Sequence, residues 1–414
     1  MTVTAPDIGR LDAETFGRVA LGPILAEFCL RLWLFERFLQ GDDAVLLFCA
    51  RGGLRMRLAY ERFLARTDLP QRLPHADLMV SRLVAARTAF DPPSPGVLSE
   101  LEREFSGQSM AEIAAALAQC NDLDLPPPWH APFEKIRFIS LLAGTEPGVV
   151  RLHRAVAEQD ALFRAHLATC TGNRRHGVLV DTGLYGSTVR ILQEGIPERQ
   201  WSGLQFARSN YKRLPTPHFA RTLGLSVESD GYKPWEVRTS ALRFWQLIES
   251  CLEPELSSVR TFTASADGGS PRANLQVAGW ESRIAPEQPG LFTGVLAYID
   301  GLAPETLHRV QEDAARAWQH LKDAVVWPDA QAVATLSLGH RSRDFGRTEL
   351  RAQFAVPGTT SPLKQIRESL WREGAVVRSF PRSGRLALPL IELIYAARAL
   401  RSEVQALRRR RRAI

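Results

Sequence analysis

Residues 176–192, HGVLVDTGLYGSTVRIL, decide the fold of this 414-residue chain. Residues 177–180 (GVLV) are a short apolar run, which is typical of a buried strand in a parallel sheet. Residues 181–188 (DTGLYGST) follow as a loop with two glycines, and residues 189–194 begin a helix. A strand, a polar glycine loop and a helix in this order indicate a sheet whose parallel strands alternate with helices.

A second unit of the same kind lies near the N-terminus. Residues 44–49 (AVLLFC) are a continuous apolar run, residues 51–53 (RGG) are a turn, and residues 54–65 have apolar side chains at helical spacing. Further helices are expected at residues 21–39, 99–124, 148–170, 304–325 and 386–407, and further strands at 76–81 and 201–207. This alternation predicts an α/β fold with a doubly wound parallel sheet.

Both glycine loops carry groups that suit a phosphate. Backbone N–H groups and hydroxyls that open a helix bind anions, and Gly183 and Gly186 can take the positive φ that lets a backbone close on one. Asp181, at the end of its strand, can hold the hydroxyls of a sugar, because ligands bind at the carboxyl ends of such strands. Arg51 and Arg82 add positive charge. The two loops suggest a ligand with two phosphate-bearing ends, and an ordinary strand–helix turn is the alternative for each.

The residues of both loops resemble a known family. CARGG after a strand is similar to the pyrophosphate loop of type I phosphoribosyltransferases, and VLVDTGLYGST resembles their phosphoribosyl pyrophosphate signature. The resemblance departs at Thr182, where the family has a second acid, and in a phosphate loop one residue shorter, with YGST in place of TGGT. It implies a type I phosphoribosyltransferase-like parallel sheet with a helical insertion and a helical C-terminal region.

A narrower resemblance rests on the order GPILAEF, FCARGG, LVDTGLYGST and LIESCLEPELSS. It is similar to a group from bacterial cell-surface polysaccharide clusters, often labelled as hydrolases of the haloacid dehalogenase type. This resemblance implies transfer of 5-phosphoribosyl from phosphoribosyl pyrophosphate to a hydroxyl of a lipid-linked glycan, with inversion to a β-ribofuranosyl 5-phosphate and release of diphosphate. A separate phosphatase would act on the product, because no strand here is followed by DxDxT. GxGxxG and GxxxxGK[ST] are absent, which excludes the dinucleotide and Walker classes.

The resemblance also assigns roles to individual residues. The 5-phosphate is expected on Gly183, Leu184, Tyr185, Gly186, Ser187 and Thr188, and Thr182 is a further expected substrate-binding residue. The diphosphate is expected on Ala50, Arg51, Gly52 and Gly53, with assistance from Arg82. Mg²⁺ is the implied cofactor, held mainly by substrate oxygens, and Asp181 is expected to hold the ribose hydroxyls or this metal.

A base for the acceptor hydroxyl is sought in the segment LIESCLEPE. Glu249 and Glu253 lie four residues apart and share one face if this segment is helical. Catalysis is one interpretation, and a solvated or salt-bridged pair is the alternative. His176 precedes its strand, at the end opposite the expected site, so we interpret it as structural.

Five segments are expected along the chain. Residues 1–95 hold the N-terminal helix and the first part of the phosphoribosyltransferase-like core, and residues 131–262 hold its second part. Residues 96–130 form a helical cap or insertion between them. Residues 263–380 are a mainly helical acceptor-side region, and residues 381–414 are an amphipathic basic tail.

Most of the formal net charge of +7 lies in this tail, where residues 395–414 contain seven arginines and one glutamate. The apolar positions of the last helix form one stripe and are followed by Arg408, Arg409, Arg410, Arg411 and Arg412. Such a helix can bind an anionic membrane surface. A helix packed on the domain, a nucleic-acid arm, a frayed end and a coiled-coil contact are alternatives. The near-neutral remainder argues against a broad nucleic-acid-binding face.

Cysteine usage and charge predict the location. The five cysteines are scattered without a CxxC pair, which indicates a reduced compartment. Residues 16–39 contain too many charged side chains for a membrane-spanning helix. The first ten residues lack the pattern of a signal peptide. We therefore expect a cytoplasmic protein, peripheral at the inner face of the membrane. Rival interpretations are a phosphoribosyltransferase with a small-molecule acceptor, and a non-catalytic phosphosugar-binding or membrane adaptor module, which the missing second acid favours.

Overall fold

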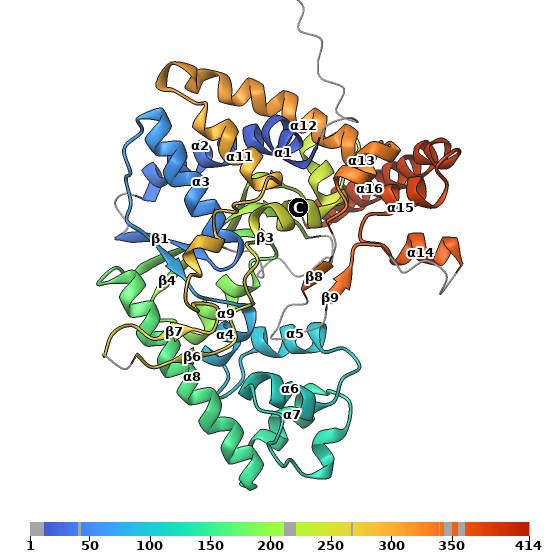
Figure 1. Ribbon diagram of the computed structural model, residues 1–414. Coiled ribbons are helices and arrows are strands. Elements are labelled where there is room, and N and C mark those ends of the chain that lie inside the picture. The colour runs from blue at the N-terminus through green and yellow to red at the C-terminus, as the bar shows by residue number, and fades with distance from the viewer. Residues whose placement is uncertain are drawn as a thin grey trace, which may run out of the picture.

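The computed structural model describes residues 12–39, 43–210, 221–265, 268–338, 340–342, 350–354 and 361–413. Its centre is a five-stranded parallel sheet with the order β2-β1-β3-β4-β5 (Figure 1). The strands are β1 (Ala44–Cys49), β2 (His75–Leu78), β3 (His176–Leu184), β4 (Gln200–Arg208) and β5 (Thr222–Glu228). This arrangement confirms the predicted α/β class.

Side chains of β1 alternate between two apolar clusters, one on each face of the sheet. Leu46 and Phe48 belong to one cluster, and Val45, Leu47 and Cys49 belong to the other. Successive side chains of a strand point to opposite faces, so a continuous apolar run needs cover on both. All six residues of β1 are buried accordingly.

Helices cover both faces of the sheet, and Figure 1 shows the two layers above and below it. The first cluster includes side chains of α2 (Gly22–Leu39), α3 (Gly52–Thr67), α10 (Trp245–Leu252), α11 (Leu291–Asp300) and α12 (Val310–Val326). The second includes side chains of α4 (Arg82–Thr88), α5 (Pro95–Glu104), α6 (Met110–Ala118), α7 (Lys135–Leu142), α8 (Pro147–Thr171) and α9 (Ser187–Gly195). The remaining short elements are α1 (Ala13–Phe16), η2 (Gly17–Leu21), η3 (Pro127–His130), η5 (Val237–Arg243), β6 (Phe262–Thr263), β7 (Arg272–Ala273), η6 (Glu281–Arg283) and η7 (Pro304–Arg309).

The predicted helices at 21–39, 54–65 and 148–170 and the strands at 44–49 and 201–207 are confirmed within a few residues. The single helix expected at 99–124 is wrong, because the chain turns at Gly107 (φ +81°) and forms α5 and α6. Ser109 and Glu112 cap each other at the start of α6, which is a signal that a new helix begins there. The helix expected at 304–325 begins as η7 and becomes α12 only at Val310.

The C-terminal region adds α13 (Ala330–Thr335), β8 (His340–Ser342), β9 (Leu350–Ala352), α14 (Pro362–Glu368), α15 (Arg372–Ser379) and α16 (Gly384–Ala413). One side of α16 is anchored to the chain that follows β5. The hydroxyl of Tyr232 donates a hydrogen bond of 2.5 Å to Glu392, and Lys233 forms an ion pair of 3.2 Å with Glu403. The tail is therefore a helix docked on the domain over these residues.

The other side of α16 is an exposed apolar stripe. It consists of Leu386, Leu390, Leu393, Ile394, Leu400, Val404 and Leu407, which are between 39% and 82% exposed. Within the part of the chain that the structure describes, no helix has the length and apolar character that crossing a membrane requires.

Candidate functional site at the ends of β1 and β3

The two glycine segments meet where the strand order changes direction. The chain leaves β1 toward β2 on one side of the sheet and leaves β3 toward β4 on the other. In open parallel sheets, the crevice outside the carboxyl ends of two such strands is the usual ligand site. Residues 50–53 follow β1 and residues 185–188 follow β3, so both predicted loops border this crevice.

The segment after β1 packs directly on the end of β3, because its glycines allow the close approach. A Cβ at Gly52 would lie 2.5 Å from Cγ2 of Thr182, and a Cβ at Gly53 would lie 2.8 Å from the backbone carbon of Phe48. Neither distance is compatible with a side chain. Close approach of α3 to the ends of β1 and β3 therefore explains these two glycines without a ligand.

The expectation that residues 181–184 are loop is wrong. β3 continues to Leu184, and Asp181, Gly183 and Leu184 pair with Gln205, Ala207 and Arg208 of β4. Gly183 has φ +133°, and a Cβ there would lie 2.2 Å from the carbonyl oxygen of Ala207. The peptide bonds 50–51 and 183–184, one in each segment, are cis.

Asp181 lies at the crevice beside a buried thiol. Its Oδ1 accepts a hydrogen bond of 2.7 Å from the backbone N–H of Thr182. Burial, together with the negative charge of Asp181, raises the pKa of Cys49 well above its usual value. Cys49 is therefore a neutral thiol and a poor nucleophile.

The side chain of Gln205, in β4, forms hydrogen bonds to the turn after β3. Gly186 has φ +64° and caps the N-terminus of α9. With the side-chain amide of Gln205 oriented so that both its groups are satisfied, its nitrogen donates to the carbonyl of Leu184 (3.3 Å). Its oxygen accepts from the N–H of Gly186 (3.1 Å). The backbone N–H of Gly186 thus faces Gln205, which the sequence did not identify as part of the site.

A cluster of four charged side chains from α4 and α5 lies next to this turn. Arg82 forms ion pairs with Glu104 (2.7 Å) and Glu100 (3.6 Å). Arg103 pairs with the same two carboxylates. Burial raises the pKa of Glu104, but the charges and hydrogen bonds of Arg82 and Arg103 outweigh it, so this pKa is lowered. The carboxylates of Glu100 and Glu104 are therefore both ion-paired with arginines.

Two members of this cluster reach the predicted phosphate turn. The hydroxyl of Ser187 donates a 2.8 Å hydrogen bond to Glu100, whose side chain is buried. Nη2 of Arg103 lies 3.5 Å from the same hydroxyl, and its guanidinium is 5.4 Å from the centre of the Tyr185 ring. The sequence associated Arg82 with the diphosphate, but the structure places it in this cluster. Arg103 was not identified, because only the folded chain brings α5 to α9.

Arg51 and Glu253 lie together, whereas Glu249 has a different partner. Nη2 of Arg51 is 2.6 Å from Oε2 of Glu253, and Nη1 donates to the carbonyl of Leu256 (3.1 Å). The carboxylate of Glu249 accepts a 2.8 Å hydrogen bond from the indole of Trp245.

A shared helical face for the two acids requires a helix over both, and this condition is not met. α10 ends at Leu252, and Glu253 has φ −87° and ψ 117°. A residue that precedes a proline is disfavoured in the helical conformation, and Pro254 follows here. The chain therefore leaves the helical path after Glu253.

Two further predictions from the sequence concern His176 and the arginines at the end of α16. His176 is buried at the start of β3, and its Nε2 lies 2.9 Å from the hydroxyl of Ser202. This supports a structural interpretation. Arg408 is exposed near the end of α16, and the side chains of Arg409 to Arg412 lie outside the described residues.

Among the described residues, no group of three His, Cys, Asp or Glu side chains forms a metal site. The single carboxylate of Asp181 is compatible with Mg²⁺, which commonly takes one or two carboxylates from the protein and the rest from water and substrate phosphates. No protein-family model matches this chain, and no curated protein is significantly similar to it.

Proposed function

We propose that this protein is a phosphoribosyltransferase that uses phosphoribosyl pyrophosphate as its donor. The observation that carries the proposal is the packing of residues 52–53 against the end of β3, which brings the two glycine segments to the carboxyl ends of neighbouring parallel strands. A donor with a phosphate at one end and a diphosphate at the other needs two anion-binding segments a few ångströms apart. The type I phosphoribosyltransferase-like arrangement of the sheet is part of the same proposal.

The proposed roles follow the position of each group. The first turn of α9, with the hydroxyls of Ser187 and Thr188, takes the 5-phosphate, since helix N-termini favour anions. Arg103 supplies the positive charge there. Residues 50–53 take the diphosphate, with Arg51 as the cation. Asp181 holds the ribose hydroxyls or Mg²⁺, which supplies charge neutralisation of the diphosphate when it is bound.

The proposed reaction is a displacement at C1 of the ribose. The bond from C1 to the diphosphate oxygen breaks, and the acceptor oxygen forms a bond to C1 from the opposite face. The diphosphate leaves with the bonding electron pair, and the acceptor hydroxyl gives its proton to a base. Glu249 and Glu253 are the candidates for that base. The 2.6 Å pair of Glu253 with Arg51, at the proposed diphosphate segment, favours the salt-bridge interpretation for Glu253, because the acceptor enters from the opposite face.

The proposed acceptor is a hydroxyl of a lipid-linked glycan, and the product, a β-ribofuranosyl 5-phosphate, passes to a separate phosphatase. The exposed stripe of α16 and the arginines that follow it support attachment to an anionic membrane surface. We place the protein in the cytoplasm, peripheral at the inner face of the membrane.

A second candidate is a non-catalytic phosphosugar-binding or adaptor module of the same fold. It is favoured by Thr182, which stands where the resembled family has a second acid. A phosphosugar that binds without turnover would distinguish this module from an enzyme.

The test is calorimetric titration with phosphoribosyl pyrophosphate and Mg²⁺, together with an assay of diphosphate release on glycan acceptors. Asp181→Asn is the decisive variant, because an amide oxygen can still accept the N–H of Thr182. We expect loss of turnover with little change in melting temperature, whereas Asp122→Asn, at an exposed position, should behave as wild type. No binding of the donor to the wild type would refute the proposal, and binding without release would favour the adaptor.

A further inference from the structure

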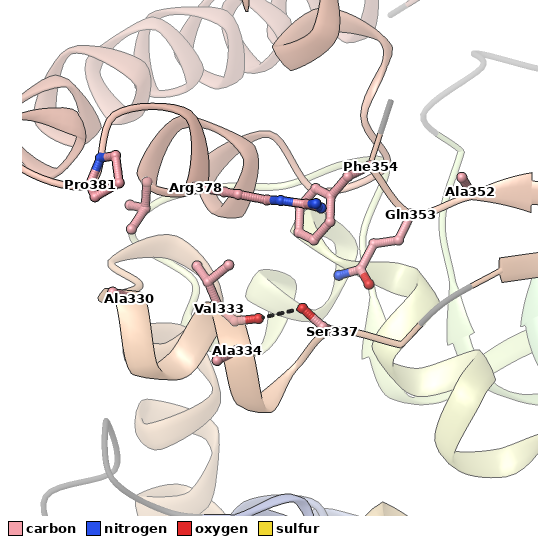
Figure 2. Close-up of a pocket in the computed structure, with 10 residues that line it drawn as sticks. Ala330, Val333, Ala334, Ser337, Ala352, Gln353, Phe354, Arg378 and Pro381 are labelled. Atoms are coloured by element: carbon pink, nitrogen blue, oxygen red, sulfur yellow. Dashed lines mark hydrogen bonds between the residues drawn. The ribbon is translucent and has the colours of Figure 1, made fainter. Parts of the chain in front are cut away.

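A pocket of about 590 Å³ lies in the C-terminal region, between α13, the residues that follow β9, and α15. Figure 2 shows Arg378 and Phe354 on one side of it, and Val333, Ala334 and Ser337 of the α13 segment on another. This volume is within the range of pockets that hold small organic ligands. None of its lining residues belongs to the site at the ends of β1 and β3.

The walls of this pocket are mainly apolar, and most of its polar side chains are already satisfied. Ser337 donates a hydrogen bond of 2.8 Å to the carbonyl of Val333. The buried amide of Gln353 donates to the carbonyl of Leu336 (3.0 Å) and accepts from the N–H of Leu338 (2.6 Å). These bonds leave an apolar surface, which favours a hydrocarbon occupant over a sugar or a nucleotide.

Arg378 is the charged group of the pocket. Its guanidinium lies 4.9 Å from the centre of the Phe354 ring, which is a cation–π contact (Figure 2). No carboxylate among the described residues pairs with it. A guanidinium without an acidic partner at the edge of an apolar pocket suits an anionic head group.

The pocket also adjoins the exposed stripe of α16. Pro381 lines it, and the turn from Phe380 to Gly384 leads directly into that helix. Phe380 is 40% exposed and Leu386 is 82% exposed, so exposed apolar residues lie before and after this turn. An occupant whose chain lies in the pocket would therefore be next to the helix that is proposed to lie on the membrane.

We propose that this pocket binds one hydrocarbon chain of a phosphorylated lipid, with the phosphate on Arg378. The choice of a phosphorylated lipid rests on the proposed function, because a glycan acceptor is carried on such a lipid. The pocket would hold the carrier while its glycan reaches the site at the ends of β1 and β3.

The probe is dodecyl phosphate below its micelle concentration, titrated into the full-length protein. Ala334 is exposed on α13 and lines the pocket, so Ala334→Trp fills the pocket without disturbing a core. Gln331→Trp is the matched control, since this neighbour is exposed on the same helix and does not line the pocket. We expect binding to wild type and to the control, and loss of binding in Ala334→Trp.

The head group is tested with Arg378→Gln. Loss of a charge-assisted contact should weaken dodecyl phosphate about tenfold or more, while dodecyl maltoside, with the same chain and no charge, binds as before. Inorganic phosphate alone should not bind measurably. Absence of dodecyl phosphate binding to wild type, equal binding to Ala334→Trp, or no effect of Arg378→Gln would each overturn the proposal.

Titration of the same variants with phosphoribosyl pyrophosphate separates this proposal from the proposed function. Ala334→Trp should leave donor binding unchanged, because the pocket and the donor site share no residue. A wild type that binds the lipid probe but not the donor refutes the proposed function and leaves the pocket assignment in place.

Discussion

Cγ2 of Thr182 occupies the space that a side chain at Gly52 would need, since a Cβ there would be only 2.5 Å away. This contact joins the segment after β1 to the end of β3. Gly52→Ala should therefore overpack the junction and destabilise the protein by about 1–3 kcal/mol. Thr182→Ser removes the methyl group in conflict, so the double variant should regain most of that loss.

The measurement is a double-mutant cycle of unfolding free energies. Gly231→Ala is the control, because a Cβ at Gly231 meets nothing within 4 Å. Contacting residues couple by about 0.5–3 kcal/mol. Additive effects of Gly52→Ala and Thr182→Ser would mean that the two loops do not constrain each other.

The strongly apolar central strands β1 and β3 were predictable from the sequence, and the edge strand β5 was not. Residues 44–49 and 177–180 are apolar runs that need cover on both faces. β5 had no prediction, because Gly224 and Ser226 interrupt its apolar residues and its pairing with β4 is irregular. Residues 181–184 read as loop because Asp181 and Gly183 are poor strand formers, but pairing with β4 overrides that preference.

The site was predictable in its position and only partly in its residues. The glycine segments follow their strands directly, so their meeting at one edge of the sheet follows from parallel pairing. The contact of Arg103 with Ser187 joins residues 84 positions apart, and no local pattern signals it. The partner of Arg51, Glu253, is 202 positions away and depends on where α10 ends.

A buried histidine should make stability fall as the solution becomes mildly acidic. Burial lowers the pKa of His166 to about 4 from the usual 6.5, and its Nε2 accepts the N–H of Met79 at 3.0 Å. The unfolded chain takes up the proton first, so stability is complete above pH 6.5 and is lost as the pH falls toward 4. The loss can reach about 3 kcal/mol.

Unfolding by denaturant at several pH values measures this effect. His166→Gln retains an acceptor for Met79 and cannot titrate, so its stability should change less between pH 6.5 and 4 than that of wild type. His308→Gln, at an exposed position, should keep the wild-type slope. Equal slopes for wild type and His166→Gln would contradict a neutral buried imidazole.

The exposed stripe of α16 should govern attachment to membranes. Leu393 and Leu400 are 66% and 58% exposed, so changing both to Ser should leave the fold intact. We expect wild type to sediment with vesicles of phosphatidylglycerol and phosphatidylcholine, and the double variant to remain in solution. Hydrophobic burial and attraction to anionic lipid are both needed, so vesicles of phosphatidylcholine alone should retain much less protein.

Ile136→Ser and Val150→Ser provide a matched control, because both residues are exposed and apolar on α7 and α8. They should not alter sedimentation. Analytical ultracentrifugation without lipid tests the rival occupant of the stripe. A dimer of wild type that the Leu393 and Leu400 changes convert to a monomer would show that the stripe joins two copies of the chain.

Arg103 and Arg51, which lie at the two glycine segments, should act on opposite ends of the donor. Arg103 lies beside Ser187 and Tyr185, whereas Arg51 precedes Gly52 and pairs with Glu253. Arg103→Gln should weaken ribose 5-phosphate about tenfold or more and leave diphosphate binding nearly unchanged. Arg51→Gln should have the reverse effect, and both variants should weaken phosphoribosyl pyrophosphate.

Calorimetric titration of the three ligands into both variants gives the comparison, with melting temperatures to detect loss of fold. Arg154→Gln is the control, because this arginine is exposed on α8 and pairs with Glu158 four residues away, as many surface arginines do. A crossed pattern requires two separate anion sites. A uniform loss for both ligands in both variants would mean that the arginines support the structure of one shared site, and the assignment of the two loops to two ends of the donor would be wrong.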